Sequence, residues 1–400
     1  MIRMALRSPS ILAIVRIGLG GLAFSLGSLM FAETLPVAEF TAVVLMMALS
    51  QVALCTGPLG ADTLINRVRG TPARSAWLRV LLTCAVVAAL LTGASIYSYE
   101  FTILNASILF VICLGSGVNR FASAVYQSRQ DFRKSQWITQ IHNAIFLLIA
   151  AVTYSLNLDI ALPAFVTIAV AYVLVPSLVW ARISSELASS TALNRTSDIK
   201  WDEGYPIVAS TLAIVFLAQL ERLSIPNLLG ERELATFAVL AAIVGGPFRV
   251  LQIGMRYTLL PRLNDARNKL EIRQILVRDA MLAGIAIGLA SLAIAIVTPW
   301  LMRVFFAEKY SIGAGLIAAA LVVGIGKVVS SLSAVVTTSL GEKKTLQKLN
   351  IWSWISLAVA IVSAVVCSSF GLTGLVYGVS VGWYLYFCAG VVLSAQYVVD

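Results

Sequence analysis

Charge is scarce in this sequence, and histidine is almost absent. Of the 400 residues, 12% are charged and 59% are hydrophobic, whereas soluble domains average about 25% charged and roughly 45–50% apolar residues. So few charged side chains could not cover the surface of a water-soluble protein of this composition, so that class is excluded. The apolar residues must instead form many separate segments, each of about 20 residues, that can cross a bilayer.

Patterns for metal binding and catalysis are also missing. No two cysteines have C-x-x-C spacing, and His142 is the only histidine, so a zinc site is not expected. The five cysteines lie inside apolar runs and are interpreted as small core residues: Cys55, Cys84, Cys113, Cys367 and Cys388. No G-x-S-x-G, H-E-x-x-H or P-loop motif occurs. We therefore expect a protein that is not an enzyme and that needs no metal or cofactor.

The apolar runs predict an all-α polytopic membrane protein with about twelve transmembrane helices. The runs lie near 10–32, 37–57, 77–98, 102–119, 138–156, 161–181, 205–226, 234–258, 279–298, 311–337, 350–370 and 374–396. The first run is too long for the apolar region of a signal peptide, so we expect it to remain as a helix. The polar stretch 182–204 predicts a linker between two six-helix bundles, 1–181 and 205–400. Such a duplicated plan is common in transporters.

The cations predict the orientation in the membrane. Lysine and arginine gather in alternate connections, at 67–79, 120–134, 182–200, 256–278 and 343–348, whereas the other connections carry few. The positive-inside rule therefore places these connections, the linker and both termini in the cytoplasm. Most of the net charge of +10 is thus a topology signal, and nucleic acid is not an expected partner.

A few ionisable residues interrupt the apolar runs themselves. They are Arg16, Glu221, Arg222, Arg249 and Lys327. Each costs roughly 2.5–3.5 kcal/mol at the centre of a spanning helix, so each should face protein or water rather than lipid. Two roles are open for every one of them: a functional site, or a structural role in which the side chain pairs with a neighbour or extends to the interface.

Depth favours a shared anion site. Counted at about 1.5 Å per residue from the cytoplasmic end of its helix, Arg16, Arg249 and Lys327 would all lie roughly 10–15 Å deep. A cavity with low-dielectric walls and several cations attracts anions, and phosphate and pyrophosphate suit arginine. We predict substrate binding by Arg16, Arg249, Lys327 and Arg222, with Arg222 receiving the head group at the outer side. Glu221 is a candidate for ion coupling, although a structural ion pair with Arg222 is the favoured interpretation.

Amides and helix breakers add a weaker indication of a polar ligand. The amides, which suit either a sugar or helix-to-helix hydrogen bonds, are Gln51, Asn119, Asn143, Gln219 and Gln252. Glycine and proline cluster at 18–21, 245–247 and 324–326, in the same runs that carry Arg16, Arg249 and Lys327. These runs can therefore bend around a cavity. The glycines Gly374, Gly378 and Gly382 indicate a packing face instead.

Several short motifs resemble those of one family of membrane proteins. They lie at 39–40, 60–62 with Arg67, 219–223, 227–230, 236–238, 305–310 and 339–344. Together they resemble lipid-linked oligosaccharide flippases, the polysaccharide biosynthesis export proteins of the MATE-like flippase superfamily. Glu221 stands where that family more often has aspartate, and Phe237 stands where tyrosine is commoner. The resemblance implies a V-shaped pair of six-helix bundles around a central cavity.

The leading functional hypothesis follows from the cations and the resemblance together. It is a transporter in the cytoplasmic (inner) membrane of a bacterium that flips an anionic, polyprenyl-pyrophosphate-linked oligosaccharide to the outer leaflet for cell-surface polysaccharide biosynthesis. Its expected partners are this lipid, the bilayer and polysaccharide assembly proteins. Two alternatives stay open: a multidrug or cation exporter of the same fold, which would need acids in the cavity, and a membrane-embedded polysaccharide polymerase or ligase, which would need a large outer loop.

Overall fold

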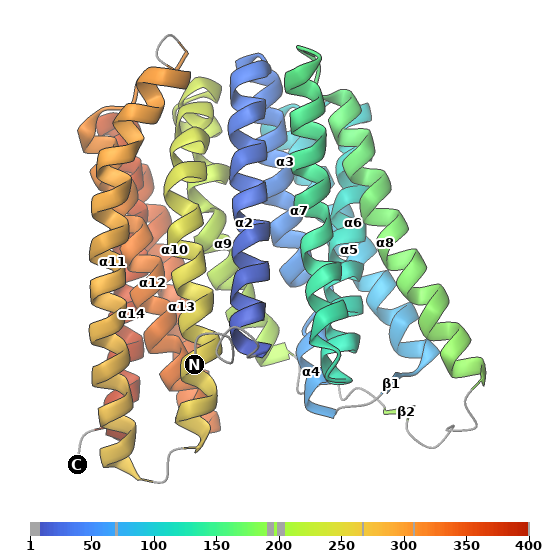
Figure 1. Ribbon diagram of the computed structural model, residues 1–400, viewed down its shortest axis with the longest axis vertical. Helices are drawn as coiled ribbons and strands as arrows, with labels where there is room; N and C mark the ends of the chain where they lie inside the picture. Colours follow the sequence, from blue (N-terminus) through green and yellow to red (C-terminus); the bar gives the residue numbers. More distant parts are fainter. Residues whose placement is uncertain are drawn as a thin grey trace. The chain divides into compact units, whose positions relative to one another are not determined.

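The computed structural model describes residues 9–68, 71–189, 196–197, 205–265, 268–306 and 309–398, and nearly all of them are helical. Figure 1 shows the long helices, which are α2 (Pro9–Thr34), α3 (Val37–Thr56), α5 (Arg74–Tyr99), α6 (Ile103–Ser128), α7 (Phe132–Ser155), α8 (Leu162–Ser189), α9 (Tyr205–Leu228), α10 (Glu231–Asp265), α11 (Lys269–Phe305), α12 (Ala314–Leu340), α13 (Lys343–Cys367) and α14 (Gly371–Val398). Each predicted apolar run corresponds to one of these helices, so the expected all-α polytopic class is confirmed. A single 3-10 turn, η3 (Ser368–Phe370), joins α13 to α14.

Several helices extend beyond the apolar runs, and they do so at the cation-rich ends. Helix α6 continues to Ser128, and α11 begins at Lys269, ten residues before the predicted start at 279. Hydropathy does not detect these turns because their side chains are polar, yet local caps stabilise them. At the start of α11, for example, the side chain of Asn268 accepts a hydrogen bond of 2.8 Å from the backbone N–H of Glu271.

Two small elements were not predicted from the sequence. Helix α4 (Ala61–Val68) follows a tight turn in which Leu59 and Gly60 both have positive φ, at 45° and 77°. Strands β1 (Thr71–Pro72) and β2 (Thr196–Ser197) form a parallel pair of two residues each. Neither strand is long enough to leave a period-two pattern in the sequence.

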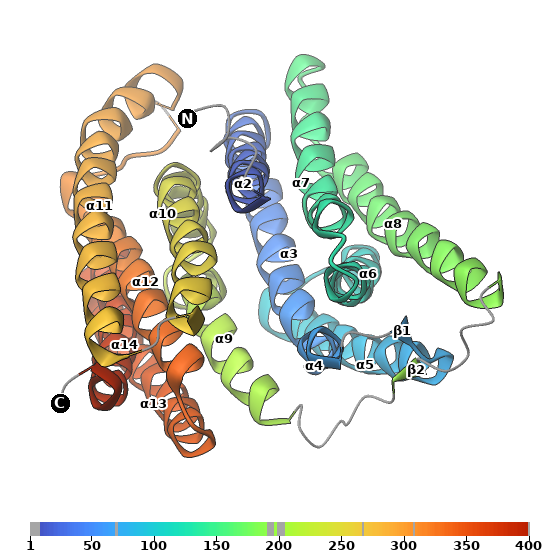
Figure 2. The ribbon, with the colours of Figure 1, turned by 60° about the horizontal axis from the view of Figure 1, so that its bottom comes forward.

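The chain divides into two compact units. The N-terminal unit is Thr34–Gln219, and the C-terminal unit combines Met1–Glu33 with Leu220–Asp400. This division differs from the two predicted bundles in two places: α2 groups with the later helices, and the boundary falls inside α9 rather than at the linker 182–204, most of which lies outside the described residues. Direct contacts bind α2 to the C-terminal unit. A side chain at Gly18, for instance, would lie 3.5 Å from Val250 of α10, and Figure 2 shows the two helices side by side.

The turn after α11 also holds α2 in this unit. The Lys309 amine donates a hydrogen bond of 2.7 Å to the carbonyl oxygen of Glu33, and the Tyr310 hydroxyl donates one of 3.2 Å to that of Ala32. These carbonyls lie at the end of α2, where the helix offers no N–H partner of its own. Burial lowers the pKa of Lys309, and the charge of Glu33 acts in the opposite direction. Lys309 and Tyr310 thus cap the end of a helix that is distant in the sequence.

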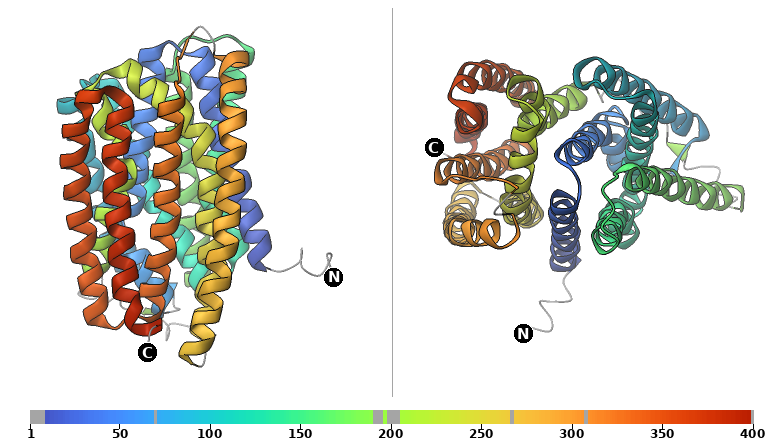
Figure 3. Two further views of the ribbon diagram at one scale, coloured as in Figure 1. Left: turned by 90° about the vertical axis from the view of Figure 1, so that its left-hand side faces the viewer. Right: turned by 90° about the horizontal axis from the view of Figure 1, so that it is seen from above.

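Each unit is built around the fourth long helix of the corresponding predicted bundle. In the N-terminal unit α6 packs against α3, α5, α7 and α8, and in the C-terminal unit α12 packs against α10, α11, α13 and α14. Figure 3 shows α12, α13 and α14 running side by side in orange and red. Small residues permit the close approach: a side chain at Gly115 would overlap the backbone of Tyr172, and one at Gly378 would lie 2.5 Å from the carbonyl oxygen of Ser363. The predicted packing face of α14 is therefore confirmed at Gly374 and Gly378.

A candidate anion site in the C-terminal unit

The structure brings four of the five predicted site residues together within the C-terminal unit. Glu221 and Arg222 lie on α9, Arg249 lies on α10, and Lys327 lies on α12. The fifth, Arg16, belongs to α2, but its side chain lies outside the described residues. Residues from three separate helices thus share one neighbourhood.

A buried ion pair forms the centre of this group. The Lys327 amine donates to the Glu221 carboxylate, with Nζ and Oε1 separated by 3.1 Å. The carboxylate side chain is 2% exposed and the lysine side chain 28% exposed. The sequence favoured a pair between Glu221 and Arg222, and the charge of Glu221 does act on Arg222, but the Glu221 carboxylate accepts a hydrogen bond from a residue of another helix. The sequence of α9 alone gives no indication that Glu221 bonds to Lys327 of α12.

Lys327 is held by contacts on three sides. Its amine lies 5.7 Å from the ring centroid of Trp383 on α14, within the range of a cation–π interaction. Its backbone carbonyl accepts a hydrogen bond of 3.4 Å from the amide of Gln252, and the same amide donates to the hydroxyl of Ser331. The position is specified by packing as well as by charge, because a side chain at the preceding Gly326 would lie 3.1 Å from Cβ of Trp383.

The two arginines extend the positive field beyond the ion pair. The charge of Arg222 interacts with those of Glu221 and Arg249, so Arg222 lies near both of them. Arg249 is exposed. The residue before it, Phe248, packs its ring where a side chain at Gly324 would lie only 2.5 Å away. This glycine lets α10 approach α12.

The charge of this group favours an anion. Glu221 neutralises one cation at most, so Arg222, Arg249 and Lys327 leave an excess of positive charge. Attraction between charges is much stronger in a low-dielectric environment than in water. A group with two negative charges, such as a phosphate ester or a pyrophosphate, has the chemistry that arginine and lysine recognise. We refer to Glu221, Arg222, Arg249 and Lys327 below as the charged cluster.

Two of the five amides proposed for a polar ligand form hydrogen bonds to other protein groups. Gln252 links α10 to α12, and the Asn143 amide donates a hydrogen bond of 2.9 Å to Gln140 on its own helix. Asn119 differs: it is 3% exposed, and neither polar atom of its amide has a hydrogen-bond partner among the described residues. Helix-to-helix bonding therefore accounts for Gln252, whereas Asn119 and Asn143 belong to the N-terminal unit and lie outside the charged cluster.

Several residues that shape the site were not identified from the sequence. Trp383 and Ser331 carry no signal that separates them from other residues of apolar helices.

Gly230 belongs to one of the motifs noted in the sequence, and the structure shows its role. Its φ is 114°, and its N–H donates a hydrogen bond of 3.1 Å to the carbonyl of Ile225. It ends α9 with a positive φ, which glycine adopts most readily.

The motif at 60–62 forms a second ion pair, in the N-terminal unit. Asp62 of α4 accepts a hydrogen bond of 2.9 Å from Arg120 of α6. The side chain of Arg67, the other member of that motif, lies outside the described residues. Glu39 also has a structural role, because its carboxylate accepts a hydrogen bond of 3.1 Å from the N–H of Ala161, just before α8. Among the described residues no group of three or more metal-binding side chains occurs.

Comparison with solved structures identifies the fold. An inward-facing MATE family multidrug resistance transporter of the MOP superfamily matches with a TM-score of 0.67 and 15% identity, over 96% of this chain and 97% of that one. The MATE multidrug transporter DinF-BH, solved as a complex, gives a TM-score of 0.63 and 18% identity, covering 98% and 95%. The lipid II flippase MurJ, in an inward closed conformation, gives 0.64 and 11%, covering 96% and 87%.

These likenesses extend over nearly the whole chain. No family model matches the sequence, and no curated protein matches it either. At identities of 11% and 18% the shared property is the fold alone. Ten helical segments among the described residues, one of them combining α13 and α14, are long and apolar enough to cross a membrane. The protein is therefore a multi-pass membrane protein with a transporter fold.

Proposed function

We propose that this protein is a transporter that flips a polyprenyl-pyrophosphate-linked oligosaccharide from the cytoplasmic to the outer leaflet by alternating access. The observation that carries the proposal is the composition of the charged cluster, in which three cations accompany one buried carboxylate. The fold supports transport, since MATE transporters and a lipid II flippase share it. The cations support an anionic substrate.

The positive charge of the charged cluster disfavours binding and export of cationic drugs. A cationic ligand needs a carboxylate that it can reach, but Glu221 is almost completely buried and already bonded to Lys327. To bind there, a cation would have to displace the amine of Lys327 and would then meet Arg222 and Arg249. Both steps are unfavourable in a low-dielectric site. An anion instead meets the exposed Arg249 and the partly exposed Lys327.

In the proposed cycle the cluster holds the pyrophosphate while the polyprenyl tail stays in the bilayer. Arg249 makes the first contact because it is exposed, and Lys327 then shares its charge between the ligand and Glu221. This arrangement limits how tightly the ligand is held, which favours release. Net transport requires that the two conformational states bind the ligand with different affinity, or that it is consumed after release. Coupling to protons would place the proton on Glu221.

The setting of this activity belongs to the same proposal. We place the protein in the inner membrane of a bacterium, where it serves cell-surface polysaccharide biosynthesis beside polysaccharide assembly proteins. Transport itself requires no catalytic group, and the proposal includes no enzyme activity.

The decisive experiment measures translocation in liposomes. The purified protein is reconstituted with a fluorescent polyprenyl-pyrophosphate sugar, and the accessibility of the head group on the opposite face is followed over time. We expect Arg249→Ala to reduce the rate at least tenfold, since a charge-assisted hydrogen bond contributes about 1.5–3 kcal/mol. Arg249→Lys should retain part of the rate. Arg303→Ala, which removes an exposed arginine at the end of α11, is the matched control and should be neutral.

The outcomes separate the three functional hypotheses. Equal transport by wild type and Arg249→Ala would contradict the role of the charged cluster. Efflux of a cationic dye such as ethidium, without movement of the lipid-linked sugar, would identify an exporter. Formation of longer glycans from supplied lipid-linked units would identify a polymerase.

A further inference from the structure

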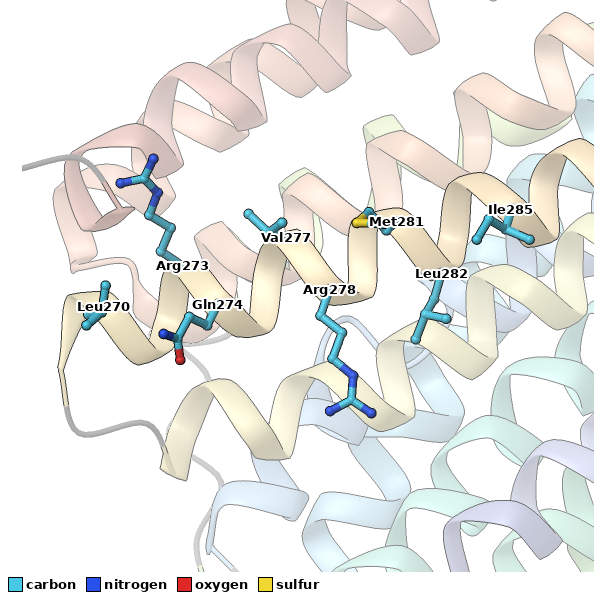
Figure 4. Close-up of a pocket in the computed structure, with 8 residues that line it drawn as sticks. All are labelled: Leu270, Arg273, Gln274, Val277, Arg278, Met281, Leu282 and Ile285. Atoms are coloured by element: carbon cyan, nitrogen blue, oxygen red, sulfur yellow. The ribbon is translucent and has the colours of Figure 1, made fainter.

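Near its start, helix α11 carries positively charged side chains beside exposed apolar ones. The proposed transport site does not include these residues. A hollow of about 560 Å³ lies along its first part, and the described residues that line it belong to this helix, from Leu270 to Ile285. Two of its lining residues are arginines, Arg273 and Arg278, and most of the others are apolar. Figure 4 shows the arginines extending from different sides of α11, with Val277 and Met281 on the same stretch of the helix.

The length of α11 places this part of the helix at a membrane surface. Its 37 residues span about 55 Å at 1.5 Å per residue, whereas the hydrocarbon core is about 30 Å thick. The apolar run begins near residue 279, so the turns before it extend into the head-group region. By the distribution of cations, that region belongs to the cytoplasmic leaflet.

The two arginines are not neutralised by any described residue. The nearby acid Asp279 already bonds to Arg262 of α10, whose Nη1 approaches its two carboxylate oxygens at 3.1 and 3.3 Å. Arg273 and Arg278 form no ion pair within the described part of the chain. The positive-inside rule explains why cations lie at this end of the helix, but it does not require such cations beside a strip of exposed apolar side chains.

The apolar strip is continuous with the lipid-facing surface of the same helix. Val277 is 55% exposed and Met281 64% exposed, and the exposed residues continue through Leu282 and Ile285 into the apolar run. Acyl chains cover such residues in a bilayer. A molecule that fits both features has a negative head group at the level of the arginines and hydrocarbon chains along the strip, and anionic phospholipids have this structure.

We propose that Arg273 and Arg278 bind the head group of an anionic phospholipid of the cytoplasmic leaflet, whose acyl chains lie on Val277, Met281 and Leu282. Gln274, between the arginines, offers an amide to the ester or glycerol oxygens of the head group. The occupant is a resident phospholipid rather than the transported molecule, so this site does not depend on the proposed function.

Lipid binding by the purified protein tests the proposal. Native mass spectrometry with added phosphatidylglycerol or phosphatidylcholine measures the preference for the anionic lipid. We expect wild type to prefer phosphatidylglycerol, and the double variant Arg273→Gln/Arg278→Gln to lose about thirtyfold in affinity for it, or about fivefold per arginine. Arg303→Gln, the same charge change at the other end of α11, should leave the preference intact. An equal loss in Arg303→Gln would show attraction to net charge alone and overturn the site.

A photo-crosslink locates the occupant. A p-benzoylphenylalanine introduced at Gln274 should crosslink to phospholipid in native membranes, and the arginine double variant should weaken that product. Crosslinks to a second copy of the chain or to another protein would overturn the proposal. The thermal unfolding of all variants in phosphatidylcholine alone should match wild type, because neither arginine loses an ion pair with a described residue. Reduced stability of the double variant there would indicate a structural role instead.

Discussion

Helix α6 is the central helix of the N-terminal unit, and α12 is the central helix of the C-terminal unit; we call these two the hub helices. They differ in their polar side chains. In α6 several polar side chains are neutral and bond to neighbouring helices: Ser116 donates to the carbonyl of Ser50 at 3.1 Å, and the hydroxyls of Ser123 and Ser135 lie 2.9 Å apart. In α12 the middle of the helix carries Lys327, whose charge is balanced by Glu221 of α9. Helix α6 thus combines neutral hydrogen bonds with a balanced ion pair between Arg120 and Asp62, whereas α12 adjoins an excess of positive charge.

This difference indicates where function lies. Neutral hydrogen bonds between helices contribute modestly to stability and need no ligand. Several cations around one carboxylate, by contrast, are costly inside a membrane. The proposed function gives a reason for this cost around one of the two hub helices. The predictions below test this contrast, beginning with the largest expected effect.

Removal of Glu221 should have the largest effect on stability. Glu221→Ala leaves Lys327 without its partner, and breaking a buried ion pair costs about 3–5 kcal/mol. Because the lysine side chain is partly exposed, we expect a loss near the lower end of that range, measured by denaturant unfolding in detergent. Ser116→Ala in α6 is the neutral counterpart and should cost about 1 kcal/mol.

The double variant Glu221→Leu/Lys327→Met separates charge from packing. It replaces the pair by apolar side chains and should recover most of the stability that Glu221→Ala loses, while transport stays impaired. If Glu221→Ala loses less than about 1 kcal/mol of stability, the size of one neutral hydrogen bond, the ion pair does not stabilise the fold.

Close helix packing gives the next effect. Gly115→Ala in α6 places a methyl group against the backbone of Tyr172, which cannot rotate away, so we expect a loss of about 1–3 kcal/mol. Gly324→Ala in α12 meets the ring of Phe248, which can shift, so its cost should be smaller. Unfolding midpoints of the two variants check the order, and a more damaging Gly324→Ala would mean that the C-terminal hub is the more rigid one.

The smallest effect is expected at an exposed charge of the N-terminal unit. Asp131 accepts a hydrogen bond of 3.1 Å from the N–H of Lys134 at the start of α7, and its carboxylate lies 2.7 Å from the Lys134 amine. The side-chain bond to Lys134 lowers the pKa of Asp131 below its usual value of 3.8. The ionised form is therefore favoured in the folded state, so the stabilisation is present above the unfolded pKa and disappears as the pH falls through the folded pKa.

Asp131→Asn isolates this charge, because asparagine caps a helix about as well as aspartate does. We expect a loss of only about 0.2–1 kcal/mol at neutral pH, typical of an exposed ion pair, and no difference from wild type in strong acid. The unfolding midpoint measured against pH checks this. A difference that persists in acid would assign the effect to the cap rather than to the charge.

The transmembrane helices were predictable from the sequence because the bilayer restricts the choice of structure. An apolar run that crosses a membrane must satisfy its backbone hydrogen bonds internally, so each run became one helix. The ends were less predictable: Asn268 starts α11 well before its apolar run, and α4 is too short and too polar to leave a hydropathy signal. The grouping of α2 with the C-terminal unit depends on distant partners such as Tyr310.

The charged cluster was predictable in its members but not in its bonds. Glu221, Arg222, Arg249 and Lys327 stood out because each interrupts an apolar run at a cost. The bond between Glu221 and Lys327, and the contact of Lys327 with Trp383, join helices that the sequence does not relate. Side chains of consecutive residues on one helix point in different directions, whereas side chains from two packed helices can point toward each other.

The sequence by itself thus determined that the chain spans a membrane many times, which end of each helix is cationic, and which charged residues must avoid lipid. These properties follow from the solvent, because water and hydrocarbon accept different side chains. Only the tertiary structure decided which charges meet, that α2 groups with the later helices, and that Arg273 and Arg278 lie beside an apolar strip without an ion pair to any described residue. Those properties follow from packing, which depends on glycine contacts and helix neighbours that no local pattern specifies.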